Sequence, residues 1–335
     1  MKHRDAKIAV IGDGGWGTTL AILLASKGYP VGLWGAFEKY VAEMDRKREN
    51  VKFLPGFHIP ENVTLTSDLQ SALTGAKLVV LAVPSQYMRS VLDRIRATGI
   101  KGLEYVSVAK GIEKKSLKVM SQLVEERLGR VPLAVLSGPC IAREIALKMP
   151  AAASVASRDA ALAARVREVL LTDSFNLFVS EDVLGVELGG SLKNVIAIAA
   201  GIVEGLGYGS NTRAALFARG VAEMARLGRK MGARGETFMG LSGLGDLATT
   251  CLSPHSRNRW LGERVGKGRT LKQALSETEM VVEGVDTCES AVRLAKRYRV
   301  SMPITEAVHS VLFRKKDPKV AVEALMRSHV ARELD

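Results

Sequence analysis

The sequence predicts an α/β protein in which a doubly wound parallel sheet is followed by an all-helical domain. Two observations predict this fold. Apolar strand patterns alternate with helical patterns in the first half of the chain, which implies a Rossmann-type sheet with helices on both faces. From about Glu187 onward only helical patterns remain. We therefore expect one domain over residues 1–186 and a second over residues 187–335, joined without a low-complexity linker.

Six strands are expected in the first domain. Each is a short apolar run bounded by polar or glycine-containing turns. The predicted strands cover residues 7–11, 30–34, 77–83, 103–109, 132–136 and 151–156. In the second domain, Pro303 and Pro318 are each expected at the start of a helix, because proline suits the first helical position.

The first strand runs into a glycine turn with the spacing G-x-G-x-x-G, formed by Gly12, Gly14 and Gly17. Gly12 would allow the sharp turn, Gly14 would admit a pyrophosphate against bare backbone, and Gly17 would let the following helix pack on the strand. The N–H groups of the first helical turn would then face the phosphates. Because strands lie on both sides of this segment, it predicts a dinucleotide site; a merely structural turn is the alternative.

The end of the second strand leaves the choice of cofactor open. Domains that select NAD carry Asp or Glu there to hold the ribose 2′-hydroxyl. In this chain Trp34, Gly35 and Ala36 occupy the place, and the first carboxylate is that of Glu38. No Arg stands at 35 or 36 to hold the 2′-phosphate of NADP, although Lys39 could replace it. The predicted cofactor is therefore NADP or NAD.

Lys193 lies just before a nearly uninterrupted apolar stretch with a helical pattern. A buried ammonium is costly unless it is paired, and burial lowers the pKa of a lysine toward neutrality. Such a lysine can give and take a proton during carbonyl reduction and alcohol oxidation. Its side chain would lean over Gly189 and Gly190, which would leave space beside it. The alternative is a lysine that reaches the surface.

Three other segments offer polar groups to a ligand. Lys110 follows the fourth predicted strand, and ligands of open α/β sheets lie beyond such strand ends. Asp246 stands in a glycine-containing turn. Arg257 and Asn258 follow Ser256 at a predicted helix start, where backbone N–H groups and a guanidinium would suit a phosphate. Taken singly, the lysine could be a surface residue, and the serine and asparagine could be helix caps.

Composition argues against several other classes of function. The formal net charge is +13, but the basic residues are scattered and the aromatic residues, 5% of the chain, do not interleave with them, so we expect no nucleic-acid partner. Cys140, Cys251 and Cys288 lack metal-ligand or redox spacing, as expected in a reducing cytosol. The histidines form no zinc-binding pattern, and no metal is expected.

No targeting or membrane segment is predicted. The longest apolar run, near Val195 to Val203, is well short of the ~18 residues that indicate a span. Residues 1–5 lead straight into the first strand without a leader pattern, and residues 332–335 do not form a peroxisomal tail. We therefore expect a cytoplasmic protein.

Taken together, these segments closely resemble the bacterial NAD(P)-dependent glycerol-3-phosphate dehydrogenases across essentially the whole chain. The matching runs, in order, are VIGDGGWGTTLA, VAKGIE, LSGPCIARE, LGGSLKNVIAIAAGI, GLGDLATTC, SRNRWLG, VVEG and MPITEAV. The resemblance implies a helical second domain of the 6-phosphogluconate-dehydrogenase type. It also implies an oxidoreductase that interconverts dihydroxyacetone phosphate and sn-glycerol 3-phosphate for glycerophospholipid synthesis, as a cytoplasmic homodimer without a metal.

The resemblance also assigns roles to individual residues. Lys193 would be the catalytic acid or base. The positions implied for substrate binding are Lys110, Gly138, Cys140, Lys193, Asp246, Ser256, Arg257 and Asn258. The positions implied for cofactor binding include the three glycines of the turn and are Gly12, Gly14, Gly15, Trp16, Gly17, Ala36, Lys110, Ala142, Arg257, Val281 and Glu283.

Three positions depart from the family pattern. Gly15 stands where many relatives carry Ser, Ala36 where a His or Arg often meets a 2′-phosphate, and Cys140 where Ser or Thr is usual. The first two leave the preference between NAD and NADP open. The third bears on one contact to a substrate hydroxyl.

Two alternative functions share parts of this pattern. A related ketoacid or β-hydroxyacid reductase would keep the glycine turn and the lysine, but not the GLGDL and SRN runs. A non-catalytic NAD(P)-binding regulator would keep the glycines without needing Lys193, Asp246 or Arg257.

Overall fold

The computed structural model of the chain describes residues 6–327. The terminal segments on which the expectation about targeting rests, 1–5 and 332–335, lie outside the described residues. The chain divides into two compact units. The first comprises the residues up to Ala109 with Met120–Leu136 and Cys140–Val183, and the second comprises Lys110–Val119, Ser137–Pro139 and the residues from Leu184 onward. Two short loops of the first half of the chain therefore belong to the second unit.

The first unit contains an eight-stranded sheet of order β10-β9-β8-β7-β6-β1-β2-β5. The pairs β9–β10, β7–β8, β6–β7, β1–β6, β1–β2 and β2–β5 are parallel. Its strands are β1 (Lys7–Ile11), β2 (Val31–Trp34), β5 (Val63–Thr66), β6 (Ala76–Leu81), β7 (Glu104–Ser107), β8 (Leu133–Ser137), β9 (Ala151–Ala156) and β10 (Phe175–Ser180). A separate antiparallel pair is formed by β3 (Glu49–Asn50) and β4 (Leu54–His58). The doubly wound sheet confirms the predicted fold class.

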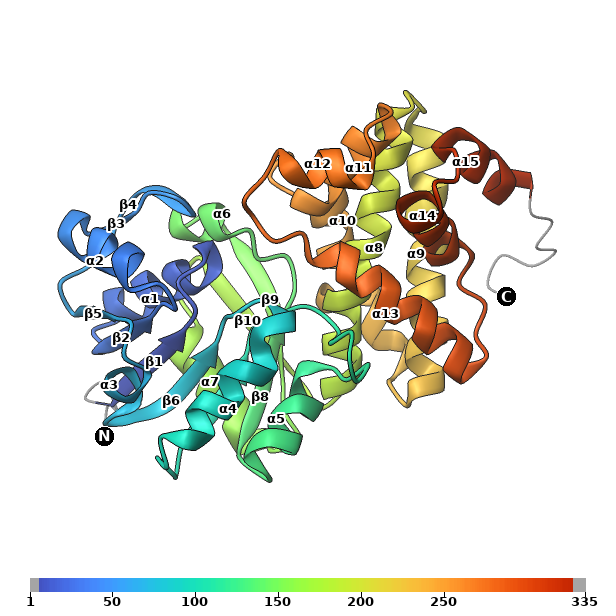
Figure 1. Cartoon of the computed structure of the whole chain (residues 1–335). Helices are drawn as coiled ribbons and strands as arrows, with labels where there is room; N and C mark the ends of the chain where they lie inside the picture. The colour runs from blue at the N-terminus through green and yellow to red at the C-terminus, as the bar shows by residue number, and fades with distance from the viewer. Residues whose placement is uncertain (1–5, 328–335) are drawn as a thin grey trace. The chain divides into compact units, whose positions relative to one another are not determined.

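Helices cover both faces of this sheet (Figure 1). They are α1 (Gly15–Ser26), α2 (Glu38–Lys47), α3 (Leu69–Leu73), the 3₁₀ turn η1 (Ser85–Tyr87), α4 (Met88–Ala97), α5 (Met120–Leu128), α6 (Ala142–Ala146) and α7 (Ala160–Leu170). Alternate residues of β1 serve the two faces: Ile8 and Val10 pack with α1 and α7, whereas Ala9 and Ile11 pack with α3, α4 and α5. A strand buried on both faces explains its continuous apolar run.

All six predicted strands are present, with ends shifted by up to two residues. The sequence analysis missed β5 and β10, which form the two edges of the sheet, and the β3–β4 pair. Edge strands have fewer buried positions: β10 alternates buried and exposed residues over its first four positions, and β5 buries only Val63 fully. Their patterns are correspondingly weaker.

The second unit is helical, as predicted. Its helices are α8 (Val183–Gly205), α9 (Ser210–Met231), η2 (Gly235–Met239), η3 (Leu241–Gly245), α10 (Asp246–Leu252), α11 (Arg257–Gly266), α12 (Leu271–Ser276), α13 (Glu283–Tyr298), α14 (Pro303–Arg314) and α15 (Pro318–Arg327). Pro303 and Pro318 begin helices as expected. Figure 1 shows α8 passing through the middle of this helical unit.

Helix α8 is buried on all sides from Gly185 to Val203. By length and hydropathy it could cross a membrane, but every residue of its apolar window is buried inside the protein, which is typical of a core helix. It meets α11 through glycines. A Cβ atom on Gly201 would lie 2.0 Å from the carbonyl oxygen of Arg259, and one on Gly262 would lie 2.0 Å from that of Ile198. Only glycine permits so close an approach of the two backbones.

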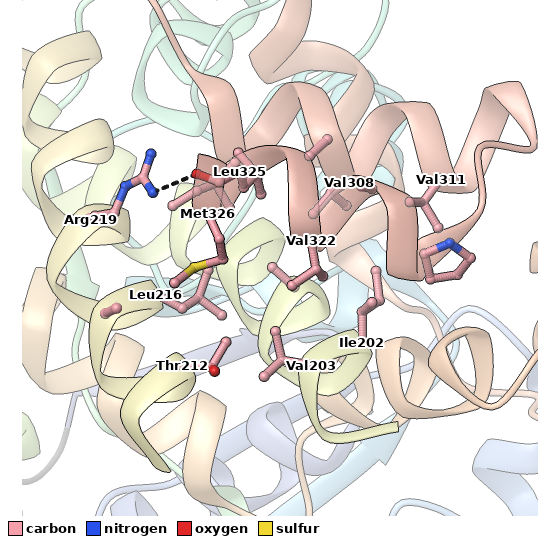
Figure 2. Close-up of a pocket in the computed structure, with 16 residues that line it drawn as sticks. Ile202, Val203, Thr212, Leu216, Arg219, Val308, Val311, Val322, Leu325 and Met326 are labelled. Atoms are coloured by element: carbon pink, nitrogen blue, oxygen red, sulfur yellow. Dashed lines mark hydrogen bonds between the residues drawn. The ribbon is translucent and has the colours of Figure 1, made fainter. Parts of the chain in front are cut away.

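An apolar cavity lies among α8, α9, α14 and α15, with an empty volume of about 560 Å³ that includes the part open to solvent. Figure 2 shows Val203, Leu216, Val308 and Val322 around it. At its edge the guanidinium of Arg219 donates to the carbonyl oxygen of Leu325 at 3.1 Å. None of the residues that the sequence predicts for the site lines this cavity.

Candidate active site

Lys193, Asp246 and Lys110 form one ion-paired cluster in the second unit. Lys193 on α8 is 6% exposed, and Asp246 at the start of α10 is 2% exposed. The ammonium of Lys193 lies 2.9 Å from Oδ1 of Asp246, and that of Lys110 lies 2.6 Å from Oδ2. Lys193 also donates to Oγ1 of Thr250 at 2.6 Å, and Lys110 to the carbonyl oxygen of Gly138 at 2.8 Å. Four predicted site residues therefore lie together.

Gly189 and Gly190 permit this cluster in a different way from the one the sequence predicted. A Cβ atom on Gly189 would lie 2.6 Å from the carbonyl oxygen of Ser242, and one on Gly190 would lie 2.2 Å from Oγ of Ser137. The space that the glycines leave is therefore filled by other segments and is not simply open beside Lys193. The two glycines let the turn before α10 and Ser137, the last residue of β8, approach α8 closely; Asp246 directly follows the first segment and Gly138 the second.

Asp246 is placed by an unusual helical turn. The sequence predicted a flexible glycine turn here, and the structure contains a π-helical turn, η3, that runs directly into α10. Gly243 is required within it, because a Cβ atom there would lie 2.1 Å from the carbonyl oxygen of Phe238. Thr250 follows Asp246 by four residues on the same helical face and donates to its Oδ1 at 3.3 Å. Widened turns of this kind are frequent at functional sites.

The electrostatics of the cluster hold the carboxylate ionised and make Lys193 a weaker base. Burial alone would raise the pKa of Asp246, but the neighbouring ammonium groups of Lys110 and Lys193 outweigh it and lower that pKa. Burial lowers the pKa of Lys193, and Lys110 adds to this effect while Asp246 opposes it. A buried lysine with a lowered pKa, fixed by a carboxylate and a hydroxyl, is suited to proton transfer.

The beginning of α11 carries a second polar group. Ser256 is the N-cap residue, and its Oγ accepts from the N–H of Arg259 at 3.2 Å. Asn258 is 8% exposed. Its Nδ2 donates to Oδ1 of Asn194 at 2.8 Å, and its Oδ1 accepts from the N–H of Gly284 at 2.9 Å. Asn258 thus connects α11 with α8 and with the start of α13. Its partner on α8, Asn194, is the residue after Lys193.

Arg257, Val281 and Glu283 also lie together in the second unit. The guanidinium of Arg257 donates to the carbonyl oxygen of Val281 at 3.0 Å. Arg257 is exposed; partial loss of surrounding water lowers the pKa of its guanidinium, while the carboxylate of Glu283 opposes that shift. An arginine remains protonated despite such a shift, so this side chain is a fixed cation suited to an anionic group.

In the first unit, the glycine turn has the geometry that its spacing predicted. Gly12 has φ +122°, and a Cβ atom there would lie 2.8 Å from the backbone of Ala82. A Cβ atom on Gly17 would lie 1.9 Å from the carbonyl oxygen of Gly12, so only glycine lets α1 pack on the end of β1. A Cβ atom on Gly14 would meet nothing within 4 Å. The N-terminal end of α1 therefore has open space beside bare backbone, as a pyrophosphate requires.

Gly15, Trp16 and Ala142 surround the same turn. A Cβ atom on Gly15 would lie 2.6 Å from the carbonyl oxygen of Phe53 and 3.8 Å from Cβ of Ala142, so this position requires glycine. The indole Nε1 of Trp16 is buried without a hydrogen-bond partner. An unpaired donor beside an open glycine turn fits a dinucleotide, and these residues would hold its phosphates.

Two family models match the chain. One, described as the N-terminus of NAD-dependent glycerol-3-phosphate dehydrogenase, matches residues 7–163, and one described as its C-terminus matches residues 182–323. The chain belongs to this family. A glycerol-3-phosphate dehydrogenase [NAD(P)+] of Citrifermentans bemidjiense is 50% identical over 330 residues, 98% of each chain.

Solved structures of this and other families are also similar. The glycerol-3-phosphate dehydrogenase of Coxiella burnetii has 38% identity and a TM-score of 0.94, covering 96% of this chain and 99% of that one. A ketopantoate reductase of Ralstonia eutropha JMP134 has 16% identity and a TM-score of 0.57, covering 96% of this chain and all of that one, and shares the fold alone. By both sequence identity and TM-score, this chain is more similar to the glycerol-3-phosphate dehydrogenase than to the ketopantoate reductase.

Two other members of the predicted site, Ala36 and Cys140, belong to the first unit, whereas the lysine cluster belongs to the second. Ala36 is exposed just beyond β2, and Cys140 is partly buried against the core of the first unit. The sequence analysis missed Thr250 and Asn194, which contact Lys193 and Asn258 directly. The four-residue spacing from Asp246 to Thr250 was the available signal for the first, and adjacency to Lys193 for the second.

Proposed function

We infer that this chain interconverts dihydroxyacetone phosphate and sn-glycerol 3-phosphate by hydride transfer with NAD or NADP. The observation that carries the inference is the buried cluster in which one carboxylate, Asp246, holds the ammonium groups of both Lys193 and Lys110. The bound nicotinamide supplies or accepts the hydride. The chain's own residues supply orientation, a proton and positive charge.

Lys193 is the proposed acid and base of the reaction. In the reducing direction it gives a proton to the oxygen on C2 of dihydroxyacetone phosphate, and in the oxidising direction it takes that proton back from glycerol 3-phosphate. Burial lowers the pKa of Lys193, which makes its ammonium a better proton donor than that of an exposed lysine. Asp246 and Thr250 hold the ammonium in position. Lys110 adds a second positive charge that stabilises a developing alkoxide.

The beginning of α11 is the proposed site of the substrate phosphate. Arg257 offers a guanidinium and Asn258 an amide, next to the first backbone N–H groups of a ten-residue helix. Ser256 acts there as a helix cap, so its contribution to the substrate is through its backbone or its hydroxyl proton. Gly138 and Cys140 are the remaining proposed substrate contacts.

The two units divide the work in this proposal. The domain over residues 1–186 binds the dinucleotide through Gly12, Gly14, Gly17 and the residues around them, and the domain over residues 187–335 supplies the catalytic and phosphate-binding groups, together with Lys110 from a loop that belongs to the second unit. Arg257, Val281 and Glu283 are proposed additional contacts to the cofactor. We further propose a cytoplasmic homodimer whose product supplies glycerophospholipid synthesis.

The first experiment compares oxidation of NADH and of NADPH, at equal concentration, with and without dihydroxyacetone phosphate. Oxidation that depends on this substrate, with either cofactor, supports the proposal. Oxidation with a ketoacid but not with dihydroxyacetone phosphate would indicate the related reductase. Binding of a dinucleotide without turnover of either substrate class would indicate a non-catalytic regulator.

A further inference from the structure

A carboxylate lies at the end of β2, although the sequence has none at that position. It belongs to Asp13, the residue between the first two glycines of the turn. A Cβ atom placed on Gly35, the residue after β2, would lie 2.3 Å from Oδ2 of Asp13 and 2.7 Å from its Cγ. The carboxylate of Asp13 therefore occupies the space that a side chain at residue 35 would take.

The position of Asp13 is fixed by its neighbours. Its carbonyl oxygen accepts from Nδ2 of Asn50 at 2.7 Å and from Oγ1 of Thr18 at 3.4 Å. The same point beside Gly35 lies 2.7 Å from Cγ2 of Val41, so the carboxylate is enclosed on that side by α2. These hydrogen bonds fix the backbone at Asp13, and its carboxylate lies beside Gly35 at the end of β2.

Oδ2 of Asp13 is buried and has no hydrogen-bond partner. A buried carboxylate oxygen without a donor is costly, and burial accordingly raises the pKa of Asp13, with its own backbone N–H opposing the shift. Such an oxygen needs a donor from a ligand. In Rossmann-type domains the ribose of the adenosine lies at the end of the second strand, where an acidic residue accepts its 2′-hydroxyl.

We propose that Asp13 is the residue that selects the cofactor and that it makes the enzyme prefer NAD. Its carboxylate accepts a hydroxyl of the adenosine ribose, and its negative charge repels the 2′-phosphate of NADP. Gly35 is required for this selection, because only glycine at residue 35 leaves room for the carboxylate of Asp13. The proposal rests on the proposed function, since it requires a dinucleotide on the glycine turn.

The residues that follow β2 agree with this preference. Ala36 and Phe37 are both exposed, Phe37 to 73%, and neither carries a charge that could hold a phosphate. The next residues, Glu38 and Lys39, are exposed and of opposite charge. Selectivity for NADP usually requires an arginine at this end of the strand.

Binding of the reduced cofactors without substrate tests the proposal. Titration of the full chain with NADH and with NADPH, followed by nicotinamide fluorescence, should give a Kd for NADH at least tenfold below that for NADPH. In Asp13→Asn, which keeps the shape and removes the charge, the ratio of the two Kd values should fall at least fivefold. Glu38→Gln is the matched control, because Glu38 is the first carboxylate in the sequence after β2. This variant should leave the ratio of the two Kd values unchanged.

A second pair of variants keeps the test independent of folding defects in one protein. Gly35→Ala should weaken NADH binding at least fivefold in the natural background, because its methyl group displaces the carboxylate. In Asp13→Ala the same change should have little further effect, so the two effects are not additive. Failure of both cofactors to bind the natural chain would refute the proposed function. Binding of both with a ratio that Asp13→Asn leaves unchanged would refute only the role of Asp13.

Discussion

Replacing Asp246 by Asn removes a negative charge that the buried ammonium of Lys193 and the partly buried ammonium of Lys110 share. The charge lies 2.9 Å from Nζ of Lys193 and 2.6 Å from Nζ of Lys110. At an effective dielectric constant of about 20, unit charges at such a distance attract by roughly 6 kcal/mol, much of which offsets the cost of burying them. Removing one partner of a buried pair typically costs about 3–5 kcal/mol. We expect Asp246→Asn to lose about that much free energy of unfolding at pH 7.

The loss should depend on pH with a definite sign. Without Asp246 the pKa of Lys193 falls further below its unfolded value, since the carboxylate is the group that raises it. Between the folded and unfolded pKa values the unfolded chain binds more protons, so the free energy of unfolding rises with pH. The deficit of Asp246→Asn should therefore shrink from pH 7 toward pH 9. In the natural chain the lowered pKa of Asp246 gives a dependence of the same sign in the acid range, because its stabilising effect is present above the unfolded pKa and is lost as pH falls through the folded pKa.

Urea denaturation at pH 7 and pH 9 measures both effects. Asp45→Asn is the matched control. Its carboxylate pairs with Arg48 at 2.8 Å but is 59% exposed, and its loss should change stability by no more than about 1 kcal/mol. A loss below about 1 kcal/mol for Asp246→Asn, with no dependence on pH, would show that the carboxylate does not balance the two lysines.

Two further substitutions, each paired with a comparison variant, test the contact of α8 with α11 and the position of Lys193. Gly262→Ala should destabilise the chain by more than about 2 kcal/mol, because its methyl group would lie 2.0 Å from the carbonyl oxygen of Ile198; Gly209→Ala, which meets nothing within 4 Å, should stay within about 1 kcal/mol. Equal stability of these two variants in urea denaturation would contradict the close contact of α8 and α11. Thr250→Val removes the hydroxyl that accepts a hydrogen bond from Lys193, and it should lower the free energy of unfolding by about 1–3 kcal/mol. It should also lower kcat more than it raises KM. Thr250→Ser, which keeps the hydroxyl, should restore most of the stability and most of the kcat. An unchanged kcat in steady-state assays of Thr250→Val would remove Thr250 from the positioning of the lysine.

Much of the fold could be predicted because local signals and tertiary packing agree along the central strands. β1 is apolar on both faces and ends in glycines that the turn requires, so the sequence pattern alone predicts strand, turn and helix. The two edge strands were missed since only part of each is buried, which leaves a shorter apolar signal. The division of the chain was only partly predictable, because residues 110–119 and 137–139 join the helical unit by contacts distant in sequence.

The site shows the same limit. Lys193 stood out because an ammonium beside an apolar stretch breaks the pattern of a core helix. That Asp246 pairs with both Lys193 and Lys110 could not be predicted from spacing, because Lys110 lies 136 positions before Asp246 and Lys193 lies in a different helix. Asp13 gave no signal at all: residue 13 is a variable position within the glycine spacing, and only the structure places its carboxylate against Gly35.

The most direct test of the account is the turnover of Lys193→Met with dihydroxyacetone phosphate, measured together with its affinity for the cofactor. Methionine keeps the length and apolar stem of the side chain and removes the proton, while Asp246 keeps its ion pair with Lys110. We predict that kcat falls by about 10²–10⁴, as expected for loss of a general acid, while the Kd for NADH stays within twofold and exposed Lys115→Met remains fully active. A kcat within tenfold of the natural enzyme would contradict the assignment of Lys193 as the proton donor.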